Sequence, residues 1–410
     1  IAVDYNFPII FLNELKELFP KSKFVIGGSG FLDTFVKSKI DFAIIGAGRE
    51  SFLRLVEALK NKTDVCEIPN LFFRTKKGNR AFIDYSGKNV NFDLNRELFP
   101  YAPFLKWKYI GFTRKDLLGD PPAIIAEFGC AYRSRKLNHR YDNLRVGELR
   151  GDTFSAKAGK RIKELFEERM RGGCSFCTCA GTHVFLSVKE TVACLMKQIR
   201  FLQKAYKFKS FVIGSENPFR FIEQLIHQIM EEQIDIEILA IRSRVDWVNK
   251  NKKILRKVAG LAKKNNFTIS LQQLGFESFI QSDLDIYNKG YRVTENVKAV
   301  ALMRELKNLA PRNFQEGGHG FIGINPWITP RELKKYSESA GAMQFLFDAF
   351  HFGNGLVLYD SCLPIYQKLK KDGLLIEYAT DLDRWRFKDK NIARLINDFS
   401  HRLGNKRQLL

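Results

Sequence analysis

From residue 122 onward the sequence alternates short apolar segments with longer amphipathic ones, and this alternation restricts the fold more than any other feature. The segments with the length and composition of buried strands are 122–129, 210–215, 235–242, 267–275, 319–325 and 355–361. Strands that alternate with helices pair in parallel through right-handed crossovers. Six such units are too few for the eight strands of a closed TIM barrel. The sequence therefore predicts an α/β fold with a partial (β/α)6 TIM-like barrel.

The first 75 residues have a different pattern and predict a separate unit. Residues 23–30 and 40–50 are apolar strands that run into glycines, and residues 11–19 and 51–60 have the spacing of amphipathic helices. Glycine-rich turns at the carboxyl ends of parallel strands mark the ligand edge of an open sheet, although they also serve simply to close tight turns. We expect a partial Rossmann-like unit over 1–75, a linker over 76–120, the barrel over 121–365 with an insertion at 131–171, and a helical cap over 366–410.

The chain is strongly basic, with 67 Lys and Arg residues against 45 Asp and Glu residues and a formal net charge of +22. Such an excess attracts polyanions, nucleic acid included, and the alternative is a lysine-rich surface that keeps the protein soluble. The sequence predicts no membrane span and no secretory signal peptide. Because it begins inside what looks like a structural element, we expect further residues before Ile1 in the natural protein.

Seven cysteines are present, and four of them lie between residues 174 and 194. The stretch 171–181 reads RGGCSFCTCAG. Crowding of this kind is unlike the disulfide framework of a secreted domain and is typical of a metal or redox site in a cytoplasmic protein. Cys130 follows the first barrel strand, so we expect it at the same mouth of the barrel as Cys174 and Cys177.

The spacing alone leaves three kinds of site open. An iron–sulfur cluster takes thiolates from short-spaced cysteines and from elsewhere in the chain. A zinc site would add Cys179 or His183 to complete four ligands. A disulfide within Cys174–Cys179 is the third alternative. A structural zinc site rarely occupies the mouth of a barrel, and this favours the iron–sulfur cluster.

These motifs resemble the radical S-adenosylmethionine (SAM) superfamily, whose usual motif is C-x3-C-x2-C with an aromatic residue before the last cysteine. FGCAYR (128–133) is similar to its first half and GGCSFC (172–177) to its second. In this sequence 43 residues separate the halves, where the family has three. The resemblance implies that a [4Fe–4S] cluster is bound by Cys130, Cys174 and Cys177, with Cys179 as the fallback third ligand.

Three further segments resemble the parts of that family that bind SAM. VIGSENPF (212–219) is similar to a turn that meets the SAM amino group, and 271–300 and 318–333 are similar to later strand-to-helix segments. The matching positions, with the aromatic residue of the cysteine motif, are Phe176, Gly214, Ser215, Glu216, Gln272, Gly275, Glu277 and Phe321. Arg242 and Arg244 are expected to hold the SAM carboxylate, with solvation of a strand end as the alternative.

The N-terminal unit resembles the second half of the cobalamin-binding domain that is fused to many radical SAM enzymes. The matching positions are Gly27, Gly28, Ser29, Gly46, Gly48 and Glu50. Small residues at strand ends let the flat corrin approach the backbone. No histidine precedes His139, so a histidine ligand for cobalt either lies before Ile1 or is not used. If residues before Ile1 are needed, this chain is expected to bind cobalamin weakly.

The resemblance implies a cobalamin-dependent radical SAM methyltransferase, which receives electrons from a donor such as ferredoxin or flavodoxin and acts on a substrate that the sequence does not identify. The insertion 131–171 carries twelve Lys and Arg residues against six Asp and Glu residues, which favours an acidic or phosphate-bearing substrate. Its length and its place between cluster ligands predict a lid over the barrel mouth, and the alternative is a lineage-specific addition. Two alternatives stay open. One is an RNA-modifying radical SAM enzyme similar to the methylthiotransferases, and the other is a zinc-stabilised nucleic-acid-binding protein without catalysis.

Overall fold

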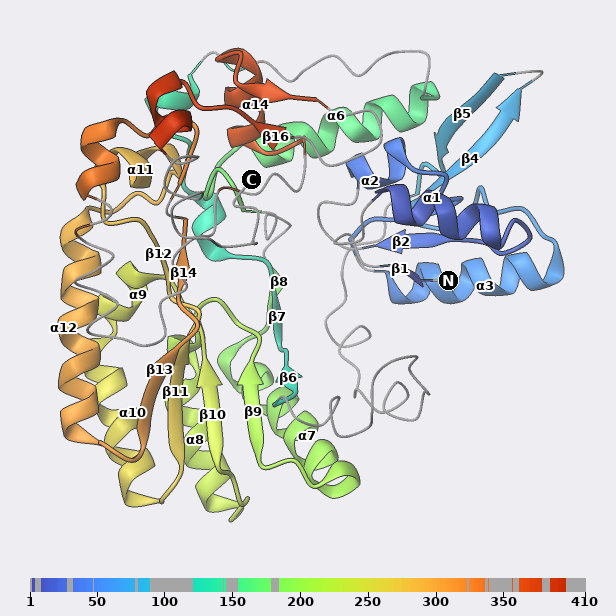
Figure 1. The fold of residues 1–410 in the computed structure, drawn as a ribbon. Coiled ribbons are helices and arrows are strands. Elements are labelled where there is room, and N and C mark those ends of the chain that lie inside the picture. The colour runs from blue at the N-terminus through green and yellow to red at the C-terminus, as the bar shows by residue number, and fades with distance from the viewer. Residues whose placement is uncertain are drawn as a thin grey trace.

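The chain forms two α/β units in a computed structural model, an N-terminal unit drawn mainly in blue in Figure 1 and a larger unit drawn from teal through green and orange to red. The structure describes residues 2–3, 9–27, 32–46, 48–77, 80–88, 121–142, 144, 154–177, 184–322, 324–335, 338, 356, 361–377 and 384–395. Among the helices in these ranges, none combines the length and the apolarity that crossing a membrane requires.

The described part of the N-terminal unit is a sheet of five strands in the order β1-β2-β3-β4-β5. Its elements are β1 (Ala2–Val3), α1 (Ile9–Leu18), β2 (Val25–Gly27), α2 (Leu32–Lys37), β3 (Phe42–Ile44), α3 (Arg49–Asn61), β4 (Leu71–Lys77) and β5 (Arg80–Tyr85). The first three strands are parallel, and β4 and β5 add to them in antiparallel pairing. The sheet thus continues to Tyr85, ten residues beyond residue 75, where we expected the linker to begin.

Each face of this sheet is covered by helices. On one face, Leu55 and Ala58 of α3 are buried against Val25, Phe42 and Phe73. The other face packs against α1, α2 and a helix from a distant part of the sequence, α6 (Ala156–Met170). Helices on both faces of a mostly parallel core are typical of a doubly wound, Rossmann-like arrangement.

Helix α6 belongs to the insertion 131–171, for which we expected a lid over the barrel mouth or a lineage-specific addition. Its residues Ala158, Ile162 and Phe166 recur every fourth position and are buried in the core of the N-terminal unit. Phe154, just before the helix, forms a parallel bridge with Ile83 of β5. The helix therefore completes the N-terminal unit, a structural role that neither expectation included.

Shortening a side chain at this contact should destabilise the protein. Ile162→Ala leaves a cavity against β5, because Ile162 is fully buried, and we expect a loss of about 2–5 kcal/mol in the free energy of unfolding. Chemical denaturation of the whole chain gives the measurement. The matched control is Lys163→Ala on the exposed side of α6, which should change it by less than about 0.5 kcal/mol. Equal effects of the two substitutions would contradict the packing described for α6.

The larger unit contains a parallel sheet whose described strands have the order β13-β11-β10-β9-β6. The elements up to its third strand are β6 (Ala123–Ile124), β7 (Glu127–Phe128), η2 (Ala131–Ser134), η3 (His139–Tyr141), β8 (Val184–Phe185), α7 (Val188–Tyr206), β9 (Ser210–Ile213), η4 (Pro218–Arg220), α8 (Ile222–Glu231) and β10 (Ile238–Ile241). The capping box of Ser187 and Glu190 at the start of α7 is formed as the sequence predicts.

The remaining elements complete the sheet and add the C-terminal segment. They are α9 (Val245–Lys250), α10 (Lys252–Lys264), β11 (Thr268–Gln272), β12 (Gly275–Glu277), α11 (Gln281–Ile286), α12 (Val293–Leu309), β13 (Phe314–Gly317), β14 (Gly320–Phe321), α14 (Pro364–Lys371), β15 (Leu375–Ile376) and β16 (Arg384–Trp385). Helix α14 lies over α11, where Leu363, Ile365 and Leu369 form a cluster with Ile286 and Tyr287.

The structure corrects three of the predicted strands. The segment 122–129 is divided into β6, which lies in the main sheet, and β7, which pairs antiparallel with β8 in a separate two-stranded sheet. The segment 267–275 is divided into β11, which lies in the main sheet, and β12, which pairs with β14 in a separate two-stranded sheet. The strand expected at 319–325 is represented by β14 alone, while β13 takes the place next to β11. The strand expected at 355–361 lies outside the described residues except at its positions 356 and 361.

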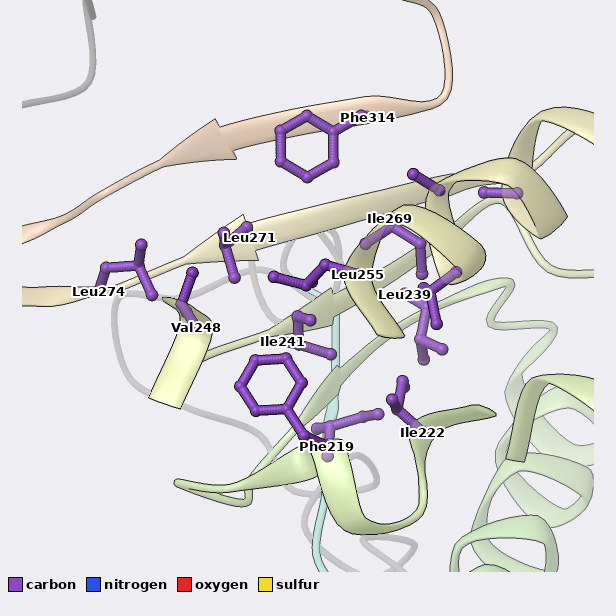
Figure 2. Packing of buried hydrophobic residues seen from close by; sticks show 14 of the residues in the cluster. Phe219, Ile222, Leu239, Ile241, Val248, Leu255, Ile269, Leu271, Leu274 and Phe314 are labelled. Atoms are coloured by element: carbon purple, nitrogen blue, oxygen red, sulfur yellow. The ribbon is translucent and has the colours of Figure 1, made fainter. Parts of the chain in front are cut away.

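The core of the larger unit lies between the parallel sheet and its helices. Figure 2 shows Leu239 and Ile241 of β10 and Ile269 and Leu271 of β11 pointing toward Leu255 of α10. All five side chains are at most 1% exposed. Burial of this extent fixes the register of the strands, and it holds their carboxyl ends together at one edge of the sheet.

Candidate functional site

The structure brings two distant cysteines to this edge. Cys130 lies directly after β7, and Cys174 and Cys177 lie in the loop that follows α6. Burial, together with the nearby Cys174 and Glu216, raises the pKa of the Cys130 thiol to about 12. Burial also raises the pKa of the Cys174 thiol, and the nearby Cys177 contributes to the increase. Cys130 therefore lies near Cys174, although 44 positions separate them in the sequence, and Cys177 lies in the same loop as Cys174.

The cysteine loop is held in place by the turn between α11 and α12. The backbone N–H of Ser175 donates to Tyr287 O at 3.0 Å, and its hydroxyl donates to Ile286 O at 2.7 Å. Asn288 Nδ2 donates to Gly173 O at 2.6 Å. Phe176 packs edge-on against Tyr287 with ring centroids 5.5 Å apart. These bonds fix the backbone on both sides of Cys174, so its position depends on the 286–288 turn.

Two buried cations stand beside the cysteines. Arg244 Nη1 donates to Cys174 Sγ at 3.1 Å, and the guanidinium lies 3.4 Å from the ring centre of Tyr132. Lys289 Nζ donates to Glu277 Oε1 at 3.1 Å. Burial alone would lower the pKa of Lys289, yet the neighbouring Tyr291, Glu277 and Cys174 together raise it, so the amine is charged.

Two glycines allow the close packing of this site. A Cβ on Gly275 would come within 2.6 Å of Glu277 Oε1, so only glycine leaves room for the buried ion pair. Gly290 has a φ of +70°, and a Cβ there would come within 2.2 Å of the Tyr132 hydroxyl. Both positions therefore require glycine for the observed arrangement around Cys174.

The donor set has the chemistry that an iron–sulfur cluster needs. Thiolates bind iron, and a cluster held by three of them is negatively charged, which Arg244 and Lys289 offset. In the part of the chain that the structure describes, no three Cys, His, Asp or Glu side chains are grouped around a single metal-ion position. Each cysteine of a [4Fe–4S] cluster binds a different iron, so such convergence is not required of Cys130, Cys174 and Cys177. Cys179 and His183 lie outside the described residues.

The turn after β9 contains three of the positions expected at SAM. Gly214 lies so close to β6 that a Cβ there would come within 2.8 Å of Ile125 Cγ1. The hydroxyl of Ser215 donates to Glu127 Oε2 at 2.7 Å, an interaction that the sequence did not predict. Glu216 is ion-paired with Arg242 at 3.3 Å from Oε1 to Nε, and its side chain is 28% exposed. Of the three, Glu216 is thus the one that presents a charged group to solvent.

The other expected SAM positions follow β11 and β13. Gln272, at the end of β11, donates from Nε2 to Ser270 Oγ at 3.0 Å. Gly275 and Glu277 form β12, next to the cysteine loop through Lys289. Phe321 in β14 is buried and stacks on Phe279 with centroids 5.9 Å apart. Of these four residues, Gly275 and Glu277 are therefore the ones that the described contacts connect to Cys174. Glu277 also raises the pKa of the Cys174 thiol.

The sequence did not single out several residues that complete the site. They are Glu127, Tyr132, Asn288, Lys289 and Tyr291. The stretch NKGY (288–291) could have indicated three of them. It lies within a segment already assigned to the site, and a glycine next to a lysine there indicates a close approach of the backbone.

The residues expected at cobalamin lie on a separate sheet. Gly27 ends β2, Gly46 follows β3 with a φ of +64°, and Gly48 precedes α3. Among the residues that the structure describes, none has an atom within 4 Å of the place that a Cβ on Gly46 would take. Glu50 pairs with Arg54 one turn along α3. Gly28 and Ser29 lie outside the described residues. Gly27, Gly46 and Gly48 offer the bare backbone that a flat, bulky group needs.

The fold is similar to that of two solved radical S-adenosylmethionine enzymes. It is similar to the solved structure of apo OxsB, a cobalamin-dependent S-adenosylmethionine radical enzyme, with a TM-score of 0.58 and 14% identity. This similarity covers 97% of the present chain and 57% of OxsB, so the chain spans little more than half of that protein.

A second solved protein has the same fold. The radical S-adenosylmethionine methyltransferase TsrM from Kitasatospora setae, with cobalamin and a [4Fe–4S] cluster bound, matches with a TM-score of 0.55 at 15% identity, over 92% of this chain and 67% of TsrM. TsrM with tryptophan substrate and the SAM analogue aza-SAM matches with a TM-score of 0.53 at 15% identity, over 91% and 65%. No protein-family model and no curated protein matches the sequence. At these identities, the likeness establishes the fold.

Proposed function

We propose that this protein is a radical SAM enzyme that binds a [4Fe–4S] cluster through Cys130, Cys174 and Cys177, and that it is a cobalamin-dependent methyltransferase. The observation that carries the proposal is the meeting of Cys130 with the Cys174 loop beside two buried cations, in a chain with this fold. When bound, the reduced cluster would supply the electron that cleaves SAM, and cobalamin would supply the methyl group.

The protein's own residues would position and shield these groups. Glu216 and Glu277 would bind the amino group or ribose of SAM, because both lie at strand ends on the side of the cysteines. Phe176 and Phe321 would contact the nucleoside, and Gly214, Ser215, Gln272 and Gly275 would shape the surrounding backbone. Tyr132 and Tyr291, which pack around Arg244, would exclude water from the cysteines.

The finer architecture and the second cofactor belong to the same proposal. We propose that the parallel sheet is part of a six-unit partial barrel, and that the N-terminal sheet binds cobalamin at its carboxyl edge. The glycines Gly27, Gly46 and Gly48, which place no side chain at this edge, support this placement. The similarity of the chain to a structure of TsrM that contains cobalamin supports it as well.

Anaerobic reconstitution with iron and sulfide tests the proposal. The reconstituted chain should bind about four irons with sulfide and should produce 5′-deoxyadenosine from SAM under a low-potential reductant. Assays with and without added cobalamin then show whether methyl transfer depends on it. One zinc in place of iron, with no SAM cleavage, would favour the zinc-stabilised nucleic-acid-binding alternative.

Glu216 should contribute to SAM affinity without holding the cluster. Glu216→Gln keeps the size of the side chain and removes its charge, so SAM binding should weaken by about 1.5–3 kcal/mol, while iron content stays unchanged. Equilibrium binding of SAM to the reconstituted protein gives the measurement. The matched control, Glu232→Gln, removes a charge from an exposed pair with Arg200 on the outer helices. Unchanged SAM affinity in Glu216→Gln would contradict the assigned role.

A further inference from the structure

We propose that Arg244 is a positioning residue that raises the reduction potential of the cluster through its hydrogen bond to the sulfur of Cys174. The inference rests on the proposed function, because it requires that Cys174 binds a cluster. It assigns Arg244 to the protein's own sulfur, whereas the sequence had suggested the SAM carboxylate as its partner.

The side chain of Arg244 is fixed at each of its nitrogens. Nη1 donates to Cys174 Sγ at 3.1 Å, Nη2 donates to Lys289 O at 2.6 Å, and Nε donates to Asp246 Oδ1 at 3.0 Å. Tyr132 stacks on the guanidinium plane. A rigid fork held by three different acceptors keeps its direction toward Cys174 Sγ. Binding a carboxylate in a bidentate manner would require Arg244 to release at least one of these partners.

Burial makes this hydrogen bond strong. The side chain of Arg244 is 6% exposed, so its charge acts on the sulfur through protein rather than through water. Asp246 offsets part of the charge at Nε, and its own side chain is 14% exposed. Nη1, which donates to Cys174 Sγ, is a different nitrogen of the guanidinium from the Nε that Asp246 contacts.

The direction of the effect follows from charge. Reduction adds one electron to the cluster and increases the negative charge on its sulfurs. A buried cation that donates to one of those sulfurs stabilises the reduced form more than the oxidised form, so it raises the potential. Removing Arg244 should make the cluster harder to reduce. Replacing it by lysine, which keeps the charge and loses the fork, should have a smaller effect in the same direction.

A redox titration of the reconstituted whole chain without SAM, followed by electron paramagnetic resonance of the reduced cluster, tests the inference. At the midpoint potential of the unmodified protein, Arg244→Met should shift the oxidised-to-reduced ratio at least about tenfold toward the oxidised form, which corresponds to about 59 mV for a one-electron couple. Arg244→Lys should lie between the two. Arg256→Gln, which removes an exposed cation paired with Glu305, is the matched control and should leave the potential unchanged.

Each outcome separates the inference from its alternatives. An Arg244→Met protein with unchanged potential and weakened SAM binding would overturn the inference in favour of a SAM carboxylate role. If Arg244→Met takes up no iron, two other variants replace it in the titration: Arg244→Lys, and Asp246→Asn, which weakens the hydrogen bond that holds Nε. Unchanged potentials in both variants would overturn the inference. If the unmodified chain takes up no cluster, the proposed function itself fails, whereas a cluster whose potential ignores these substitutions defeats the inference alone.

Discussion

A Cys174→Ala protein should retain little or no iron after anaerobic reconstitution, where the unmodified chain should bind about four irons. Arg244 and Lys289 flank Cys174, and the bonds of Ser175 fix its backbone. With no thiolate at this point, one iron would lack its protein ligand. Absorbance of the thiolate-to-iron bands and SAM cleavage should fall to background together.

The same measurement on the other cysteines tests the ligand set. Cys130→Ala and Cys177→Ala should also lose the cluster, whereas Cys194→Ala should keep it, because Cys194 lies on α7, where its sulfur accepts from Gln198. A Cys130→Ala protein that keeps a full cluster and cleaves SAM would contradict the assignment of Cys130. Cys179 would then be the third ligand.

The Lys289–Glu277 pair should produce the largest change in stability. Both side chains are buried, Lys289 at 3% and Glu277 at 11% exposure, so Lys289→Met leaves a carboxylate without its counter-charge. Breaking a buried pair in this way costs about 3–5 kcal/mol in the free energy of unfolding. Chemical denaturation of the protein before cluster reconstitution gives the measurement, so loss of iron cannot account for the effect.

Two variants complete this experiment. The double variant Lys289→Met with Glu277→Gln removes both charges and should recover part of the lost stability. Lys298→Ala breaks the exposed pair with Glu295, in which the lysine is 65% exposed, and should cost no more than about 1 kcal/mol. If Lys289→Met costs no more than Lys298→Ala, the pair is not buried as described.

Much of the fold could be predicted because buried parallel strands are continuous apolar runs. Strands β9 and β10 lie within the predicted segments 210–215 and 235–242. Strand β13 was missed because its sequence, FQEG, has one apolar residue, Phe314, and only this residue is fully buried. At the edge of the described sheet, a strand can keep its backbone pairing with polar side chains, and periodicity does not reveal it.

The cysteines of the candidate site could be predicted from the sequence more readily than its buried charged side chains. The rule that parallel strands end at one edge predicted that Cys130 lies near Cys174, and the Cys174 sulfur does act on the pKa of Cys130. Cys130 nevertheless follows β7, a strand of the separate antiparallel pair, and the three-cysteine ligand set stays a prediction. Lys289 was missed because a lysine in a loop is usually exposed, and its burial depends on Glu277 and on the cysteine loop, which come from other parts of the chain. Such a pair exists only after folding, so no local pattern encodes it.

The place of α6 also determines the order in which the molecule can be completed during synthesis. The ribosome makes β5, which ends at Tyr85, before α6, which begins at Ala156, and the apolar face formed by Phe72, Ile83 and Tyr85 stays without that cover in the meantime. Contacts between distant parts of a chain form slowly, because a long loop must close first. The N-terminal unit is thus a discontinuous domain, and a fragment that stops before residue 154 would expose part of its core to aggregation.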